Sequence, residues 1–137
     1  MIQSIFVDTG AWYAAMVRRD RDHEAAKQFL KNNALPLITT DYVMDETVTL
    51  LLSRVGHSYA VRFLDMLQTS QKIQLVYLTP RQIAATVALF RERADKQWSF
   101  TDCSSFIVMQ DHQIQTAFAF DEHFKQAGFQ VKPSLMP

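Results

Sequence analysis

The sequence predicts an α/β domain with a mostly parallel central sheet that is covered by helices on both faces. Short apolar segments alternate with segments of helical spacing along the whole chain. Parallel strands need long crossover connections, and the helical segments supply them. The 137 residues include only 3 Gly and 4 Pro, so no linker divides the chain. We therefore expect one domain that spans residues 1–137.

The first half of the chain contains two predicted strands and four predicted helices. The apolar run that ends in Ile5-Phe6-Val7 predicts a strand over residues 2–7, and Asp8-Thr9-Gly10 ends it. Either Thr40 or Asp41 can cap the third helix, which Gly56 ends. The second strand is expected over residues 35–39, and the helices over residues 11–17, 23–31, 43–55 and 58–67.

The second half repeats the alternation. Thr79-Pro80 begins a helix in a favoured arrangement, with a hydroxyl before an early proline. Asp121 is expected to cap a short helix that ends at Gly128. Further strands are expected over residues 73–78 and 114–120, with a candidate edge strand at 129–131, and helices run to about residue 94 and from about 102 to 110.

Composition and charge exclude several classes of protein. A hydrophobic content of 48% and a charged content of 20% are typical of globular domains rather than disordered chains. The single cysteine, Cys103, excludes an internal disulfide and a cysteine-based zinc site. No apolar run approaches the roughly 20 residues that span a bilayer. We therefore expect a soluble cytoplasmic protein with no membrane contact.

The net charge is balanced, with 14 Lys and Arg against 14 Asp and Glu. This balance removes the strongly basic signature of many nucleic-acid-binding proteins. It does not exclude a nucleic-acid partner, because an acidic metal site can offset a basic groove elsewhere. A basic cluster at Arg18, Arg19 and Arg21 could contact phosphate, with solvated loop charge as the alternative.

Four acidic residues are expected at one edge of the predicted sheet. Asp8 and Asp121 directly follow apolar strands, and Glu46 and Asp102 lie near the starts of helices. In open parallel sheets, ligands bind beyond the carboxyl ends of the strands. Carboxylates gathered in one pocket repel each other, and a hard divalent cation relieves that repulsion. Oxygen ligands favour Mg²⁺ or Mn²⁺, which can activate water for attack on a phosphodiester.

Each of these acids also has a simpler explanation. Asp8 and Asp121 could each be only a helix N-cap, and Asp102 could only stabilise a helix dipole. Helical spacing alone does not choose between Glu46 and its neighbour Asp45.

Four ordered segments of the chain resemble the PIN-domain ribonucleases, and among them the VapC-like toxins of toxin–antitoxin modules. The segments are Ile5-Phe6-Val7-Asp8-Thr9-Gly10-Ala11-Trp12, Ile38-Thr39-Thr40-Asp41-Tyr42-Val43-Met44-Asp45-Glu46-Thr47, Trp98-Ser99-Phe100-Thr101-Asp102-Cys103-Ser104-Ser105-Phe106 and Ala119-Phe120-Asp121-Glu122-His123-Phe124. They follow the family's order and span nearly the whole chain. The resemblance implies a three-layer α/β/α sandwich around a parallel sheet, which is a PIN-like and Rossmann-like architecture.

The resemblance also implies a function and a set of site residues. It implies an endoribonuclease toxin that uses Mg²⁺ or Mn²⁺, forms a homodimer and is silenced by a cognate antitoxin protein. The residues that match the acidic metal-binding quartet are Asp8, Glu46, Asp102 and Asp121, and Thr9 and Thr101 match supporting hydroxyls. The resemblance thus chooses Glu46 over Asp45. Ala119 departs from the family, which often has Thr or Ser there.

Other polar and aromatic residues receive no site role. The four histidines, His23, His57, His112 and His123, lack metal-ligand spacing and are expected at the surface or in caps. Cys103 is expected to be packed beside the site. Trp12 and Trp98 flank two of the acids, so they could stack on RNA bases, with core packing as the alternative.

Three other classes of function share single features with this sequence. Asp8-Thr9-Gly10 spells the aspartic-protease motif, but those enzymes are all-β. A receiver-like α/β signalling module would need paired acids after the first strand and a lysine after a late strand, whereas Asp121 occupies the late position here. A catalytically inactive PIN-like interaction domain is the third, and the complete acidic quartet argues against it.

Overall fold

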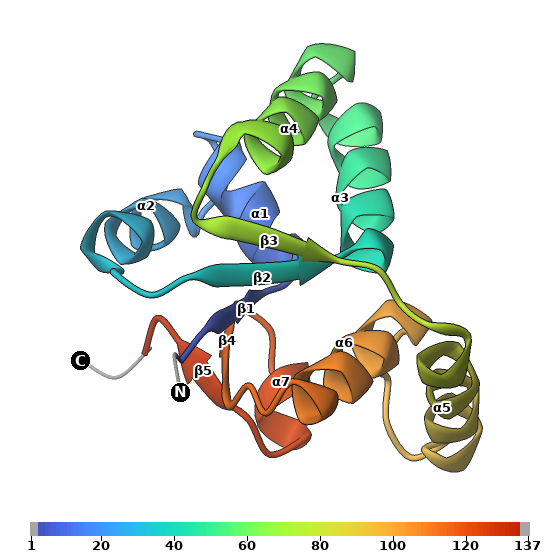
Figure 1. Cartoon of the computed structure of the whole chain (residues 1–137). Coiled ribbons are helices and arrows are strands. Elements are labelled where there is room, and N and C mark those ends of the chain that lie inside the picture. Colours follow the sequence, from blue (N-terminus) through green and yellow to red (C-terminus); the bar gives the residue numbers. More distant parts are fainter. Residues whose placement is uncertain (1–2, 135–137) are drawn as a thin grey trace.

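The chain forms a three-layer α/β/α sandwich, described over residues 3–134 by a computed structural model (Figure 1). The sheet order is β3-β2-β1-β4-β5, and every neighbouring pair of strands is parallel. This confirms the predicted α/β architecture. The five strands are β1 (Ile5–Val7), β2 (Leu37–Thr40), β3 (Ile73–Val76), β4 (Thr116–Phe118) and β5 (Gln130–Lys132).

Helices cover both faces of this sheet. In Figure 1, α1, α3 and α4 lie above the sheet, and α6 and α7 lie below it, with α5 packed against α6. The helices are α1 (Thr9–Met16), α2 (His23–Asn32), α3 (Asp41–Arg54), α4 (His57–Thr69), α5 (Pro80–Glu92), α6 (Phe100–Asp111) and α7 (His123–Gln126). Within residues 3–134, no helix combines the length and the apolar character needed to cross a membrane.

The strand order reverses at β1, and this reversal positions the site. The chain builds β1, β2 and β3 in one direction and then returns to add β4 and β5 on the other side of β1. Crossovers therefore leave the sheet in opposite directions from β1 and β4, which opens a crevice at their carboxyl ends. Asp8 follows β1 and lies beside the end of β4, because its amide donates a hydrogen bond of 3.1 Å to the Phe118 carbonyl.

The core explains why the central strands are continuous apolar runs. Phe6, Val7 and Phe118 are fully buried, as expected for parallel strands that are covered on both faces. Trp12 packs on Phe63 above the sheet with ring centroids 5.5 Å apart. Below the sheet, Phe106 packs between Trp98 at 4.9 Å and Phe124 at 5.0 Å.

These contacts settle the role of the two tryptophans. Trp12 is 1% exposed and Trp98 is 6% exposed, so neither offers a face to an RNA base. The stacking alternative is therefore wrong for both. Cys103 is buried, as expected.

Several element boundaries differ from the sequence prediction. The strand expected over 2–7 is shorter at Ile5–Val7, and residue 2 lies outside the described residues. The strand expected over 114–120 is only Thr116–Phe118, because the Ile114 amide is used to bond the Met109 carbonyl at the end of α6. The strand expected over 35–39 starts at Leu37, since Leu35 bonds the Asn33 side chain in a turn.

Capping side chains set where the helices start. Thr40, not Asp41, caps α3, because its hydroxyl accepts a hydrogen bond from the Val43 amide. The Asp41 carboxylate instead accepts from the Leu78 amide at 3.0 Å. Ser99 starts α6 at Phe100, two residues before the expected position, through a capping box with Asp102.

Candidate active site

The four predicted acids line one open pocket at the carboxyl ends of β1 and β4. Asp8 comes from the end of β1, Asp121 from the loop after β4, Glu46 from α3 and Asp102 from α6. Only the fold brings these four sequence segments together. The pocket is also lined by Thr9, Thr101, Asp45 and His123.

Asp8 is the most buried of the four acids, at 4% exposed. It occupies the N-cap position of α1, but its carboxylate makes no capping hydrogen bond. The explanation that Asp8 is only a helix cap is therefore wrong. Asp8 therefore lies between β1 and α1, and its carboxylate does not cap the helix.

Burial raises the pKa of Asp8 well above its ordinary value. The negative charges of Asp121 and Asp102 raise this pKa further, and Glu46 adds a smaller effect, while the Thr9 backbone amide opposes them. An ionised Asp8 is thus destabilised by its own surroundings. A cation in the pocket would remove that penalty.

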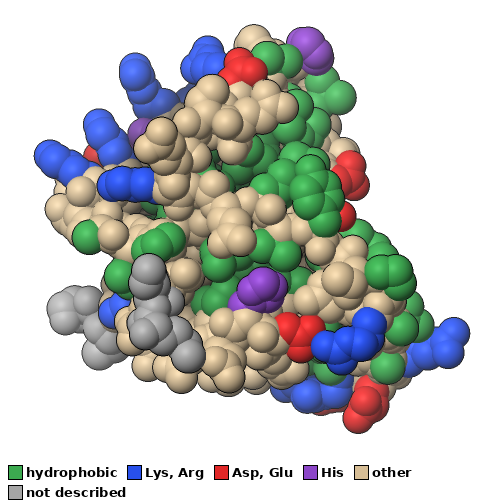
Figure 2. All heavy atoms as spheres, in the orientation of Figure 1, with side chains coloured by type: hydrophobic (Ala, Val, Ile, Leu, Met, Phe, Trp, Pro, Cys, Tyr) green, Lys and Arg blue, Asp and Glu red, His purple; other side chains and the backbone are tan. Residues whose placement is uncertain are grey.

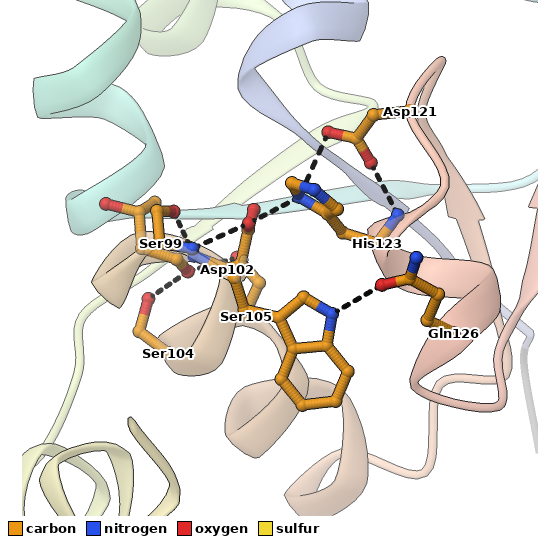
Figure 3. A network of polar contacts seen from close by, with 9 residues as sticks. Ser99, Asp102, Ser104, Ser105, Asp121, His123 and Gln126 are labelled. Carbon is orange, nitrogen blue, oxygen red and sulfur yellow. Dashed lines mark hydrogen bonds and ion pairs between the residues drawn. The ribbon is translucent and has the colours of Figure 1, made fainter. Parts of the chain in front are cut away.

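Asp102 is oriented by two hydrogen bonds that converge on a single oxygen (Figure 3). Its Oδ2 accepts from the Ser99 amide at 3.0 Å and lies 2.7 Å from Nδ1 of His123. The Ser99 hydroxyl in turn accepts from the Asp102 amide. With Oδ2 engaged twice, Oδ1 is the oxygen left to face a ligand.

His123 belongs to the site, so the expectation that it has a surface or capping role is wrong. Its amide donates to Oδ1 of Asp121 at 3.0 Å, and its Nδ1 lies 3.6 Å from Oδ2 of the same residue (Figure 3). Asp102, Asp121 and His123 each offer one ligand atom within 4.8 Å of one another. The signal in the sequence is position: His123 lies two residues after Asp121, in the short loop that follows an apolar strand.

Asp121 does not occupy the N-cap position of the short helix that follows it, but its carboxylate accepts a hydrogen bond from the first amide of that helix, as a cap does. The N-cap position of α7 belongs to Glu122, and Asp121 lies one residue further out, where it accepts from the His123 amide. This turn leaves Asp121 exposed at the rim of the pocket.

Glu46 and Asp45 both line the pocket, but they differ in burial and effect. Glu46 is half-buried and Asp45 is exposed. The Glu46 charge contributes to the raised pKa of Asp8, and Asp45 is not among the causes of that shift. The electrostatics of the pocket therefore favour Glu46, as the resemblance does.

The two threonines differ in what they offer. The Thr9 hydroxyl is buried and has no hydrogen-bond partner among residues 3–134, although this residue lines the pocket. An orphaned hydroxyl beside carboxylates is a position that a ligand or its water would satisfy. The Thr101 carbonyl accepts hydrogen bonds from the hydroxyls of Ser104 and Ser105, which fixes the first turn of α6. Ala119 is buried and supplies no hydroxyl.

These residues fit a divalent cation. The donors are carboxylate oxygens with one imidazole nitrogen nearby, and hard cations prefer oxygen ligands. The buried charge of Asp8 and the orphaned Thr9 hydroxyl are both penalties that a bound cation would relieve.

Comparisons with known proteins agree with this geometry. The family model described as "PIN domain" matches residues 5–130. The "23S rRNA-specific endonuclease VapC20" of Mycobacterium tuberculosis is 34% identical over 130 residues, which cover 94% of this chain and 98% of that protein. The crystal structure of VapC20 superposes with a TM-score of 0.87 at 33% identity, covering 91% of this chain and 95% of the other.

More distant structures share the fold. FitAcB from Neisseria gonorrhoeae gives a TM-score of 0.65 at 18% identity, covering 93% of this chain and 95% of that one. VapBC2 from Rickettsia felis gives 0.67 at 11% identity, covering 95% and 98%. A parallel sheet excludes the all-β aspartic proteases, and the matches do not favour a receiver-like module. The chain therefore belongs to the PIN-domain family, and within that family it is a VapC-like endoribonuclease.

Proposed function

We propose that this pocket cleaves RNA phosphodiesters with Mg²⁺ or Mn²⁺, held by Asp8, Glu46, Asp102 and Asp121. The observation that carries the proposal is the buried Asp8 carboxyl, whose ionised form three neighbouring carboxylates destabilise. A protein gains no stability from such an arrangement. A divalent cation makes it favourable, and RNA cleavage is chemistry that such a cation supports.

Each acid would have a distinct part in holding the cation. The bound metal would supply an activated water and neutralise charge on the phosphate. Asp8, buried between the end of β1 and the start of α1, would hold the cation from the inner part of the pocket. Asp102 offers Oδ1, while Asp121 and Glu46 approach from the rim.

His123 acts as a positioning residue in this proposal. Its ring holds Oδ2 of Asp102 and its amide holds Oδ1 of Asp121, so one residue fixes two acids that come from different elements, α6 and the loop after β4. Partners that orient metal-binding carboxylates are worth roughly 10- to 100-fold in metal affinity or activity.

Ribosomal RNA is the substrate class that we propose. The relative that is 34% identical over nearly its whole length is named for cleavage of 23S rRNA. Sequence-specific RNA recognition favours loops and unpaired bases, which a folded ribosomal RNA displays. The open pocket leaves room for such a strand to reach the carboxylates.

Two protein partners complete the proposal. The first is a cognate antitoxin, which would place a basic side chain among the carboxylates, because Arg pairs well with carboxylate oxygens. The second is another copy of this chain. Its docking surface would include exposed apolar side chains such as Tyr77, at 65% exposed, and Phe90, at 48%.

The test is cleavage of purified ribosomes and of protein-free total RNA, with the cut sites mapped by primer extension. We expect cuts in the large-subunit RNA with Mn²⁺ or Mg²⁺ and none with EDTA. Cleavage that persists in EDTA would contradict the metal-dependent site. Absence of cleavage in both RNA preparations, with either metal, would overturn the proposed function.

A further inference from the structure

A second pocket, basic rather than acidic, lies at the far end of α1. Its cations are Arg18 and Arg19 from the loop after α1, Lys27 from α2 and Arg62 from α4. Among the described residues that line this pocket, none is acidic. Figure 2 shows Lys and Arg side chains gathered at the upper left, over α2 and beside α4. We call this feature the basic pocket.

The cations of the basic pocket are not neutralised by the acids of the same loop. Asp22 pairs with Arg21 at 3.7 Å, and Asp20 accepts a hydrogen bond from the Asp22 amide. Neither acid lines the pocket. The nearby Tyr59 ring supports Arg62, whose guanidinium carbon lies 4.8 Å from the ring centroid. This stacking holds a cation in place at an exposed site.

The basic pocket and the acidic pocket share two helices. Thr9 and Gly10 at the start of α1 line the acidic pocket, and Met16 at its end lines the basic pocket. Eight residues of helix separate these ends by about 12 Å. On α3, Ser53 lines the acidic pocket, and Val55, directly after this helix, lines the basic one.

A further cation lies between the two pockets. The guanidinium of Arg54, on α3, is 5.5 Å from the centroid of the Tyr13 ring on α1. Positive charge therefore continues from the basic pocket towards the carboxylates along the contact between α1 and α3. The chain therefore has no net charge but carries two separated regions of opposite charge, the acidic pocket and the basic pocket.

We propose that the basic pocket binds backbone phosphates of the RNA strand whose scissile bond lies at the carboxylates. This inference rests on the proposed cleavage of RNA. At a rise of about 3.4 Å per stacked nucleotide, 12 Å corresponds to three or four nucleotides. A strand that follows α1 from one pocket to the other would place anionic phosphates at Arg19 and Arg62, where guanidinium groups bind them well.

The test uses the double variant Arg19→Gln/Arg62→Gln, which replaces two exposed guanidinium groups with neutral polar side chains. The matched control is Arg91→Gln, which removes an exposed arginine from α5. Steady-state cleavage is measured on a short RNA, about 12 nucleotides long, that contains the mapped cut sequence. We expect KM to rise roughly tenfold in the double variant with kcat within twofold, and no change in the control.

Binding is measured separately in the cleavage-deficient Asp8→Asn background. The slope of the logarithm of the RNA-binding constant against the logarithm of salt concentration should become less negative by about 0.7 for each phosphate that the double variant no longer neutralises. A KM and a salt slope unchanged by the double substitution would overturn the inference while leaving RNA cleavage itself intact. A second outcome would also overturn the inference: if polyglutamate binds as tightly as RNA, and the double substitution weakens both to the same extent, the basic pocket is a site for an acidic protein segment.

Discussion

Replacing Asp8 with Asn should stabilise the metal-free protein at neutral pH. Asn keeps the shape of the side chain and its N-cap position but removes the charge that burial and three nearby carboxylates destabilise. The folded pKa of Asp8 lies well above 3.8, so the folded state holds a proton that the unfolded state has already released. Wild-type stability therefore falls as the pH rises between these two values.

The size of this effect follows from linkage. A difference of one bound proton changes the free energy of unfolding by about 1.4 kcal/mol per pH unit. Between pH 3.8 and the raised pKa of Asp8, the free energy of unfolding of Asp8→Asn should exceed that of wild type by an amount that increases by at most about 1.4 kcal/mol per pH unit. Above the raised pKa, this difference should stay constant. Urea unfolding in EDTA across the pH range measures it.

A divalent cation should shift the balance of stability from Asp8→Asn towards wild type. At a hundredfold excess over its Kd, Mn²⁺ should add about 2.7 kcal/mol to wild type and much less to Asp8→Asn. Asp45→Asn is the matched control, because Asp45 lines the same pocket but is exposed, and its stability should stay within about 0.5 kcal/mol of wild type. An Asp8→Asn protein that is less stable than wild type in EDTA at every pH would refute this reasoning.

Three further predictions concern the support of the site. His123→Leu should lower Mn²⁺ affinity by at least tenfold, whereas His123→Asn, which can still donate to Asp102, should retain part of it; calorimetric titration with Mn²⁺ checks both, and equal loss would contradict the positioning role. Ser99→Ala should cost about 1 kcal/mol through loss of the α6 cap and should weaken Mn²⁺ binding as well. Phe106→Ala should cost roughly 3–5 kcal/mol in urea unfolding, because its fully buried ring packs against three aromatic side chains; a loss below about 1 kcal/mol would contradict this packing.

The sequence predicted the parallel sheet and the edge where the acids meet, for an identifiable physical reason. A parallel strand that is buried on both faces must be apolar along its whole length, so Ile5-Phe6-Val7 is visible as a strand. An acid directly after such a run must lie at its carboxyl end. Asp8 is therefore placed by local pattern alone, whereas β4 ends at Phe118 and Asp121 follows two residues later, in the loop rather than directly after the strand.

Other parts of the site depend on contacts that the sequence does not display. Glu46 and Asp45 are adjacent on α3 and point about 100° apart, so only the three-dimensional position of α3 relative to Asp8 distinguishes them. His123 has no local ligand spacing, and its partner Asp102 lies 21 residues earlier in the chain. The position of Arg62 in the basic pocket likewise depends on how α4 packs near the end of α1.

The most direct test of the proposed active site compares RNA cleavage by Asp8→Asn and Asp45→Asn in Mn²⁺. Both substitutions remove one negative charge from a residue that lines the same pocket, and circular dichroism and thermal melting establish that both variants are folded. If Asp8 holds the metal, Asp8→Asn should abolish cleavage while Asp45→Asn stays near wild type. Wild-type cleavage by a folded Asp8→Asn protein would contradict the assignment of this pocket as the active site.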